Sequence, residues 1–157
     1  MTISSKIKDN GIYLGYITFN PDENVGQRMC FHGALKRKDY ISMGDIVYGM
    51  YINDQLVKIG MTASAQGWYG RQGTYTNINP NEQTNAMFRR KIGEIFDYAD
   101  VEIHVYAIQI PKIIDKYFDP ISGTTVCEEV SRARKVEKRW TDIAKIEGED
   151  LYLCTQN

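Results

Sequence analysis

The sequence predicts an α+β fold built as one domain. Strands are indicated by two apolar runs, Ile46–Ile52 and Leu56–Gly60, which flank a polar turn, and by the alternating segment Val101–Ile110. A helix is indicated by apolar residues that recur at helical spacing over about Val126–Ile146. At 157 residues the chain is long enough to bury a substantial core.

The composition is that of a soluble globular protein, with 43% apolar and 25% charged residues. The polar N-terminus is unlike a secretory signal, and no run approaches the roughly 20 apolar residues of a membrane span. Three cysteines without metal-binding spacing predict reduced thiols, so we expect a cytoplasmic protein with no membrane partner.

The net charge of −1 does not by itself indicate a nucleic-acid partner. The basic residues are nevertheless clustered, at Lys36–Lys38, Arg89–Lys91 and Arg132–Arg139. Each cluster is consistent with either a solvated face or a phosphate-binding surface.

Residues 1–43 form an N-terminal extension in front of the first apolar run. Within it, Ile12–Phe19 predicts a strand and Asn20–Gly26 a turn-rich loop, whereas Gln27–Tyr40 is mixed and basic. One role for such an extension is a structural cap on the sheet.

The two apolar runs predict a β-hairpin that carries two buried polar side chains, Tyr48 and Lys58. A two-residue loop would place them on opposite faces, because side chains alternate along a strand. A loop of three or five residues would pair Met50 with Lys58 and Gly60 with Tyr48, so that both polar side chains share a face. The turn-compatible residues Asn53–Gln55 favour the odd loop, and Gly60 would then leave room for a ligand.

Two helices are predicted after the hairpin. Thr62 or Ser64 can cap a first helix that runs to about Arg71. A loop over Thr76–Asn81 separates it from a second helix over about Glu82–Tyr98. We therefore expect Arg71 at a helix end beside the hairpin.

The C-terminal third contains a predicted loop and the final helix. Prolines and glycines within Lys112–Thr125 predict a loop or insertion. Gly148 ends the helix that begins near Val126. The tail Leu151–Asn157 is either a short strand or a packed coil.

Glu137 stands out on that final helix, because its position falls within the arc of apolar residues. A buried ionised carboxylate costs several kcal/mol unless it is paired, so we expect a cation beside it. The candidates are a divalent metal, Lys58 and Arg71. The alternatives are a structural salt bridge, or a head group in water at the edge of the face. Glu129 is a second candidate on the same predicted face.

The motifs Val47-Tyr48, Lys58-Ile59-Gly60 and Gly70-Arg71 together resemble the core of the GIY-YIG nucleases. A lysine replaces the tyrosine of the second motif in restriction endonucleases of that family, and this chain is most similar to those. The resemblance implies a small three-stranded antiparallel sheet flanked by helices, with a β-β-α-α-β-α core. The nuclease domain would span residues 44–157, after an extension, residues 1–43, that is either a cap or a DNA-contacting segment.

The resemblance also implies an active site. Tyr48 would act as general base toward water, Lys58 would lower its pKa, and Arg71 would bind the phosphate. Glu137 would be the metal ligand, holding one Mg²⁺ or Mn²⁺ ion per active site. Met61 stands where lysine-containing relatives can have a histidine, so one possible proton carrier is absent.

The implied function is metal-dependent, sequence-specific, restriction-type cleavage of double-stranded DNA. Because so small a core has one active site, cutting both strands requires a homodimer or sequential nicks. Two alternatives are a nicking or structure-specific nuclease of phage or repair type, and a DNA-binding module without catalysis. The aromatic residues Trp68, Tyr69 and Tyr75 either stack on bases or pack in the core.

Overall fold

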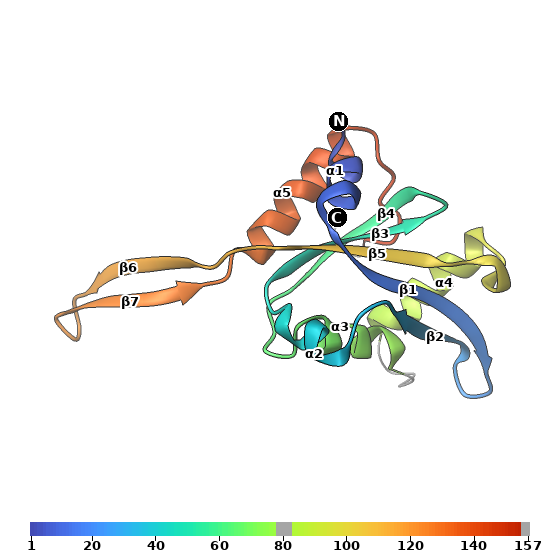
Figure 1. Ribbon diagram of the computed structural model, residues 1–157, viewed down its shortest axis with the longest axis horizontal. Coiled ribbons are helices and arrows are strands. Elements are labelled where there is room, and N and C mark those ends of the chain that lie inside the picture. The colour runs from blue at the N-terminus through green and yellow to red at the C-terminus, as the bar shows by residue number, and fades with distance from the viewer. Residues whose placement is uncertain (78–82, 155–157) are drawn as a thin grey trace.

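The computed structural model describes residues 1–77 and 83–154, and its central element is a five-stranded antiparallel sheet (Figure 1). The order of strands across this sheet is β2-β1-β5-β3-β4. Its strands are β1 (Ile12–Asp22), β2 (Gly26–Gly33), β3 (Ile46–Ile52), β4 (Gln55–Thr62) and β5 (Ile103–Gln109). A separate two-stranded sheet is formed by β6 (Ile113–Asp119) and β7 (Thr124–Val130).

Helices cover both faces of the five-stranded sheet. They are α1 (Ile3–Asn10), α2 (Arg37–Ser42), α3 (Gly67–Thr76), α4 (Gln83–Ile95) and α5 (Ala133–Ile146), with a 3₁₀ turn, η1, at Tyr98–Asp100. One buried cluster joins the sheet to α2, α3 and α4, through side chains such as Trp68 and Phe88. The other joins the opposite face to α1 and α5, through Ile7 and Ala144. Strand β3 lies between both clusters, which is why all its residues are buried.

The fold is mixed α+β, as predicted, but the expectation of a three-stranded sheet is wrong. Strands β1 and β2 extend the sheet because β1 pairs with β5 over Ile12–Ile17. The first 43 residues therefore contribute two strands to the central sheet. The division into an extension, residues 1–43, and a nuclease domain, residues 44–157, stays a prediction.

The hairpin formed by β3 and β4 is hereafter called the central hairpin. Its register is the predicted one, but a β-bulge and not an odd-length loop produces it. Tyr48 pairs with Gly60 and Met50 pairs with Lys58, as expected. The loop, however, has only two residues, Asn53 and Asp54, whose φ angles of 50° and 64° suit a tight hairpin turn. The extra residue is a β-bulge at Val57, where the register shifts, and a bulge restores the shared face that an odd loop would have produced.

The two helices nearest the site also differ from prediction. Helix α3 begins at Gly67 rather than at Thr62 or Ser64, and it continues past Arg71 to Thr76. Gly67 has a φ of +56°, and a Cβ atom there would lie within 2.4–2.7 Å of three carbonyl oxygens of the α2 region. Glycine is the residue that fits this positive φ and close contact at the first position of α3.

The final helix is shorter than predicted, because Val126–Val130 belongs to strand β7. The predicted loop Lys112–Thr125 is mostly the other strand of the same hairpin, β6. Figure 1 shows this hairpin projecting from the body of the molecule. Glu129 consequently lies on an exposed strand and not on the helix that carries Glu137.

The remaining predictions concern segments at the limits of the described residues. The predicted loop Thr76–Asn81 lies partly outside the described residues. Glu82, the first residue of the predicted second helix, also lies outside them, and the description resumes at Gln83. The tail is a packed coil over residues 151–154, with Leu151 and Leu153 buried, and residues 155–157 lie outside the description. Among the helices of the described chain, none is long and apolar enough to cross a membrane.

Candidate active site

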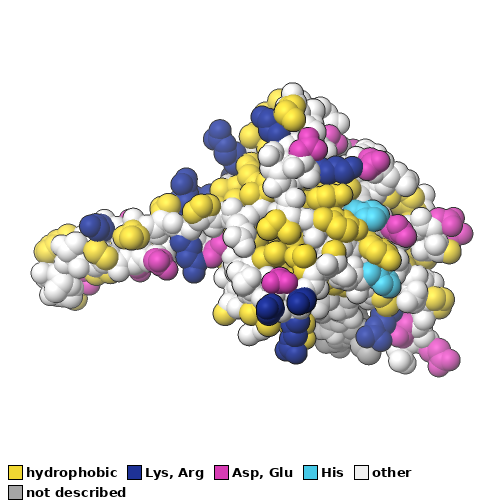
Figure 2. All heavy atoms as spheres, viewed as in Figure 1, with side chains coloured by type: hydrophobic (Ala, Val, Ile, Leu, Met, Phe, Trp, Pro, Cys, Tyr) yellow, Lys and Arg dark blue, Asp and Glu magenta, His cyan; other side chains and the backbone are white. Residues whose placement is uncertain are grey.

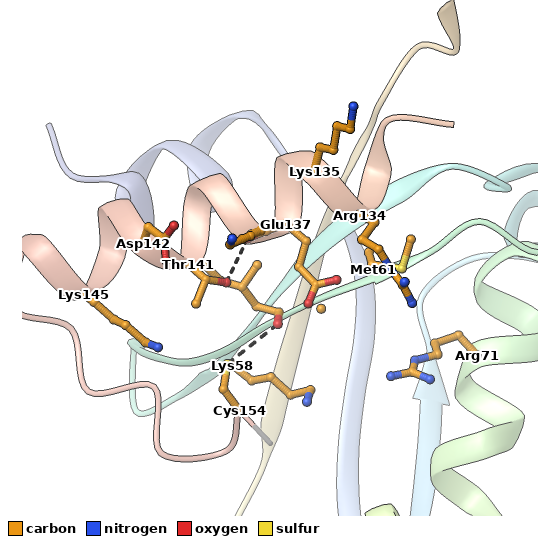
Figure 3. A pocket seen from close by; sticks show the side chains of 13 residues that line it. Lys58, Met61, Arg71, Arg134, Lys135, Glu137, Thr141, Asp142, Lys145 and Cys154 are labelled. Atoms are coloured by element: carbon orange, nitrogen blue, oxygen red, sulfur yellow. Dashed lines mark hydrogen bonds between the residues drawn. The ribbon is translucent and has the colours of Figure 1, made fainter. Parts of the chain in front are cut away.

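A cavity of about 640 Å³ lies along β4, the strand at one end of the sheet (Figure 3). Because β4 is the edge strand of the described sheet, side chains from both helical layers can meet beside it. Strand β4 contributes Lys58, helix α3 contributes Arg71, and helix α5 contributes Glu137. The other lining residues are Ile59, Gly60, Met61, Arg134, Lys135, Lys138, Thr141, Asp142, Lys145 and Cys154.

Three of the four predicted site residues therefore line one cavity, although nearly 80 positions separate Lys58 from Glu137 in the sequence. The fourth, Tyr48, is fully buried beneath it. The phenol oxygen of Tyr48 accepts a hydrogen bond from Nε of Arg71 at 3.0 Å. Tyr48 thus reaches the cavity through Arg71 rather than directly.

Gly60 explains how the Tyr48 ring fits. A Cβ atom at Gly60 would lie 2.4 Å from the ring and hydroxyl of Tyr48. The space that a side chain would occupy is therefore filled by the tyrosine itself. Gly60 thus accommodates Tyr48, and it also lines the cavity, so the expectation that it leaves room for a ligand stays a prediction.

Tyr75 belongs to the same hydrogen-bonded group and was not identified as a site residue from the sequence. Its hydroxyl lies 2.8 Å from the hydroxyl of Tyr48, and Nη2 of Arg71 donates to it at 3.4 Å. Tyr75 is one helical turn beyond Arg71 on α3, and this i,i+4 spacing places both side chains on one face. The i,i+4 spacing from Arg71 was the only sequence signal for Tyr75. Aromatic residues at helical spacing usually pack in the core, so this signal is weak.

The environment of Tyr48 favours its neutral form. Burial raises the pKa of the Tyr48 phenol far above its ordinary value, and the neighbouring Tyr75 adds to this. Arg71 and Lys58 lower the pKa of Tyr48, but by less than burial raises it. In this conformation Tyr48 is a protonated phenol.

Arg71 remains a cation despite being largely buried. Burial alone would lower the pKa of Arg71, but Tyr48 and Tyr75 raise it above its ordinary value. Its guanidinium points into the cavity (Figure 3). Because only one Nε and one Nη2 proton are used by the phenols, the planar fork keeps donors for an incoming anion.

Lys58 is only 5% exposed, and its ammonium has a carbonyl partner. Its Nζ donates to the backbone oxygen of Leu153 at 3.4 Å. Leu153 in turn donates its backbone N–H to the carbonyl of Val57 at 3.1 Å, which holds the C-terminal segment against β4. The tail therefore forms part of the cavity wall.

Glu137 is half-buried, and its carboxylate points into the cavity (Figure 3). Burial raises the pKa of the Glu137 carboxyl above its ordinary value, while Lys58, Arg71 and Arg134 partly oppose this. In the described part of the chain, no basic group lies within 4.0 Å of this carboxylate. The alternative of a structural salt bridge is therefore wrong, and there is space between Glu137 and the cations.

The cavity as a whole is electropositive. It is lined by six basic residues, Lys58, Arg71, Arg134, Lys135, Lys138 and Lys145, and by two acidic ones, Glu137 and Asp142. This excess of positive charge attracts an extended anion and repels a free cation.

The donor set fits a Mg²⁺-like ion that is bound together with a phosphate. The described residues contain no group of three or more histidine, cysteine or acidic side chains that could enclose a metal. Mg²⁺ is commonly held by one or two carboxylates, with waters and substrate phosphates completing the shell. Glu137 alone satisfies the protein part of that requirement.

The aromatic residues beside the site are mostly packing groups. Trp68 and Tyr75 are buried, and Trp68 makes an edge contact with Tyr48 at a centroid distance of 5.0 Å. In this conformation neither residue can stack on bases. Tyr69 is half-buried, with the guanidinium of Arg37 lying 4.5 Å from its ring centroid.

Comparison with known proteins supports the fold. No family model matches the sequence, and no curated protein has a similar sequence. Among solved structures, a mutant of bacteriophage T4 EndoII is similar with a TM-score of 0.51 and 14% identity, over 96% of this chain and 98% of the other. The chain therefore shares its overall fold with EndoII.

A second solved structure is restriction endonuclease HPY188I in complex with product DNA. Its TM-score is 0.47 at 15% identity, over 98% of this chain and 84% of the other. Because this TM-score is below 0.5, only the similarity to EndoII is used as evidence for the fold.

Proposed function

We propose that this protein is a metal-dependent endonuclease of the GIY-YIG type that cleaves double-stranded DNA. The observation that carries the proposal is the convergence of Lys58, Arg71 and Glu137 on one electropositive cavity, with Tyr48 bonded to Arg71 beneath it. The fold shared with bacteriophage T4 EndoII supports a nuclease.

Arg71 is proposed to bind the scissile phosphate. Its guanidinium faces the cavity, and a planar fork suits two phosphate oxygens. The remaining Nη protons of Arg71 would bind phosphate oxygens while its Nε stays bonded to the Tyr48 phenol. The bound phosphate would then lie beside the Tyr48 oxygen.

Tyr48 is proposed to be the general base. Only its phenolate can take a proton from water, so the base requires positive charge nearby to ionise. Lys58 and Arg71 are the cations that lower its pKa in the structure. This role predicts activity that increases with pH, because burial holds the phenol protonated in the free protein.

Glu137 is proposed to hold one Mg²⁺ or Mn²⁺ ion beside the phosphate. Such an ion would neutralise charge on the phosphoryl group and on the leaving oxygen. The cations lining the cavity oppose a free divalent ion, so we expect tight metal binding only together with DNA. Asp142 lines the rim of the same cavity and serves as a matched comparison.

The deciding experiment is digestion of supercoiled plasmid and of long linear DNA, with Mg²⁺ or with a chelator. Discrete linear fragments indicate site-specific cutting of both strands, whereas open circles alone indicate a nicking enzyme. We expect Glu137→Gln to reduce cleavage at least about a hundredfold, because a bound metal supplies several kcal/mol of charge stabilisation. Asp142→Asn should retain most activity.

A DNA-binding module without catalysis is the second candidate, and the complete burial of Tyr48 favours it. DNA that shifts in a gel but stays intact with either metal would support that candidate and refute the nuclease. Cleavage that is equally strong in the Glu137→Gln protein would refute the metal assignment.

A further inference from the structure

The hairpin Ile113–Val130, hereafter the arm, is built unlike the rest of the molecule. Strands β6 and β7 pair only with each other among the described residues, and they project from the body (Figure 1). An isolated two-stranded hairpin is marginally stable in water at best. We therefore expect the arm to be stabilised by packing against another surface.

The arm exposes large apolar side chains that a solvated hairpin would not retain. On one face of the arm Ile113 is 43% and Tyr117 46% exposed, and on the opposite face Ile114 is 66% and Phe118 63% exposed. Ile121 at the tip is 95% exposed. Figure 2 shows apolar side chains spread along the arm. Exposed apolar side chains concentrated on one projecting element point to a site of interaction.

The charge of the arm is negative, which disfavours DNA as its partner. It carries Asp115, Asp119, Glu128 and Glu129 against a single basic residue, Lys116, giving a net charge of −3. Asp115 pairs directly with Glu128 across the two strands. Like charges directly opposite one another destabilise a hairpin, so this face requires a basic partner.

The acidic pair shares its face with apolar residues. Side chains of directly paired residues project to the same side, so Ile113 with Val130 and Tyr117 with Val126 flank the pair of carboxylates. This face therefore presents apolar side chains at both ends and two negative charges in the middle. A complementary surface would be apolar and basic.

Helix α5 carries such a surface on its outer side. A shallow groove there is lined by Lys135, Lys138, Arg139, Asp142, Ile143 and Ile146. It adjoins the candidate active-site cavity, because Lys135, Lys138 and Asp142 line both. Ile146 is 86% exposed, so the apolar part of the groove is uncovered in a single chain. The arm and α5 of one chain diverge from the short connection at residues 131–132 (Figure 1), so the arm extends away from its own groove.

We propose that the arm docks onto the outer groove of α5 in a second copy of this chain. Two-fold symmetry would make the contact reciprocal, with each arm lying on the partner's α5 and both active sites present in one particle. The carboxylates of Asp115 and Glu128 would meet the basic groups of Lys135, Lys138 and Arg139. The proposal rests on the arm and the groove and not on nuclease activity. Because Lys135 and Lys138 also line the cavity into which Glu137 points, a docked arm would lie beside the partner's candidate site.

The test is the oligomeric state of the full chain, measured by sedimentation equilibrium between about 1 and 100 μM. We expect a dimer for the wild type. Glu128→Arg alone and Arg139→Glu alone should each weaken dimerisation at least about tenfold, because each places like charges together. The double variant should recover to within about threefold of wild type, since the pair is exchanged.

Two further variants keep the result interpretable. Glu23→Arg changes the same charge in the exposed β1–β2 turn and should leave the dimer unchanged. Tyr117→Ser removes an apolar contact of the arm and should favour the monomer. Circular dichroism would check that each variant is folded.

Several outcomes would overturn the proposal. A wild type that stays monomeric at 100 μM would do so, as would a dimer that persists in every arm variant. Arm variants that lose affinity for a DNA duplex while the oligomeric state is unchanged would assign the arm to nucleic acid instead. A double variant no better than the single ones would exclude this particular pairing of arm and groove.

Discussion

The central hairpin and the arm are both two-stranded antiparallel units, yet their side chains are distributed in opposite ways. The central hairpin buries polar groups, among them the Tyr48 phenol and the Lys58 ammonium. The arm exposes apolar groups such as Ile114 and Phe118. Buried polar groups and exposed apolar patches are the two departures from ordinary packing that carry information about function. The buried polar groups are the basis of the proposed active site, and the exposed apolar groups are the basis of the proposed contact with a second copy.

The comparison also separates two kinds of stability. The central hairpin lies between two apolar clusters, so its polar groups are held in one arrangement by packing. The arm has no such support within the described chain. We therefore expect substitutions in the central hairpin to affect activity and folding strongly, and substitutions in the arm to affect assembly.

The largest expected effect follows from replacing Tyr48. Tyr48→Phe should lower kcat by about 10²–10⁴-fold if the phenol is the general base. Tyr75→Phe is the matched control, because Tyr75 also contacts Arg71 and also bonds to the other phenol. We expect a much smaller loss for Tyr75→Phe, measured by single-turnover cleavage of a defined DNA.

The pH profile separates a base from a positioning residue. Burial raises the pKa of Tyr48, so the reactive phenolate becomes more abundant as pH rises. Wild-type cleavage should therefore increase toward alkaline pH, and Tyr48→Phe should lose that dependence. Equal losses in both phenylalanine variants, with unchanged pH profiles, would mean that the two tyrosines only position Arg71.

A second, intermediate effect is expected at Gly60. Gly60→Ala would place a methyl group against the Tyr48 ring, and overpacking of a core typically costs about 1–3 kcal/mol. Urea denaturation would measure the loss in free energy of unfolding. Gly73→Ala on α3 is the control, because its Cβ would meet open space and alanine favours a helix by up to about 1 kcal/mol. Equal stability of the two variants would show that the Tyr48 ring is loosely held.

The smallest effect is expected on stability, from removing the charge of Glu137 in the metal-free protein. Burial raises the pKa of Glu137, so the folded protein holds that proton more tightly than the unfolded chain does. Ionising Glu137 therefore destabilises the metal-free protein as pH rises. Glu137→Gln should be slightly more stable than wild type above the pKa of Glu137, and equal to it well below the ordinary carboxyl range.

Glu129→Gln is the control for that measurement, because Glu129 is exposed on the arm. Thermal melts from pH 3 to 8 should show no pH-dependent gain for it. A gain of the same size in both variants would mean that the cavity does not distinguish Glu137 from a solvated carboxylate.

Much of the candidate site follows from local pattern. The central hairpin was predictable because two short apolar runs flank a polar turn, and such a pattern depends only on neighbouring residues. The position of Glu137 was predictable because α-helical periodicity places it among apolar residues. In both cases a polar residue in an apolar setting was the signal.

The arm was not predictable in the same way. Val126 and Val130 are four residues apart, and a spacing of four fits both a helical face and one side of a strand. Their assignment to the final helix was wrong because no local rule separates the two. The bulge at Val57 was likewise hidden, because packing on both faces of the sheet selects the register.

Sequence alone singled out the candidate site residues Tyr48, Lys58, Arg71 and Glu137, because residue type and spacing are written in the chain. Only the tertiary structure decided that three of them open onto one cavity while Tyr48 lies beneath Arg71. It also decided that the sheet has five strands and that an acidic, apolar arm leaves the body. The physical reason is that contacts between distant segments depend on how whole layers pack, and no short stretch of sequence encodes that arrangement.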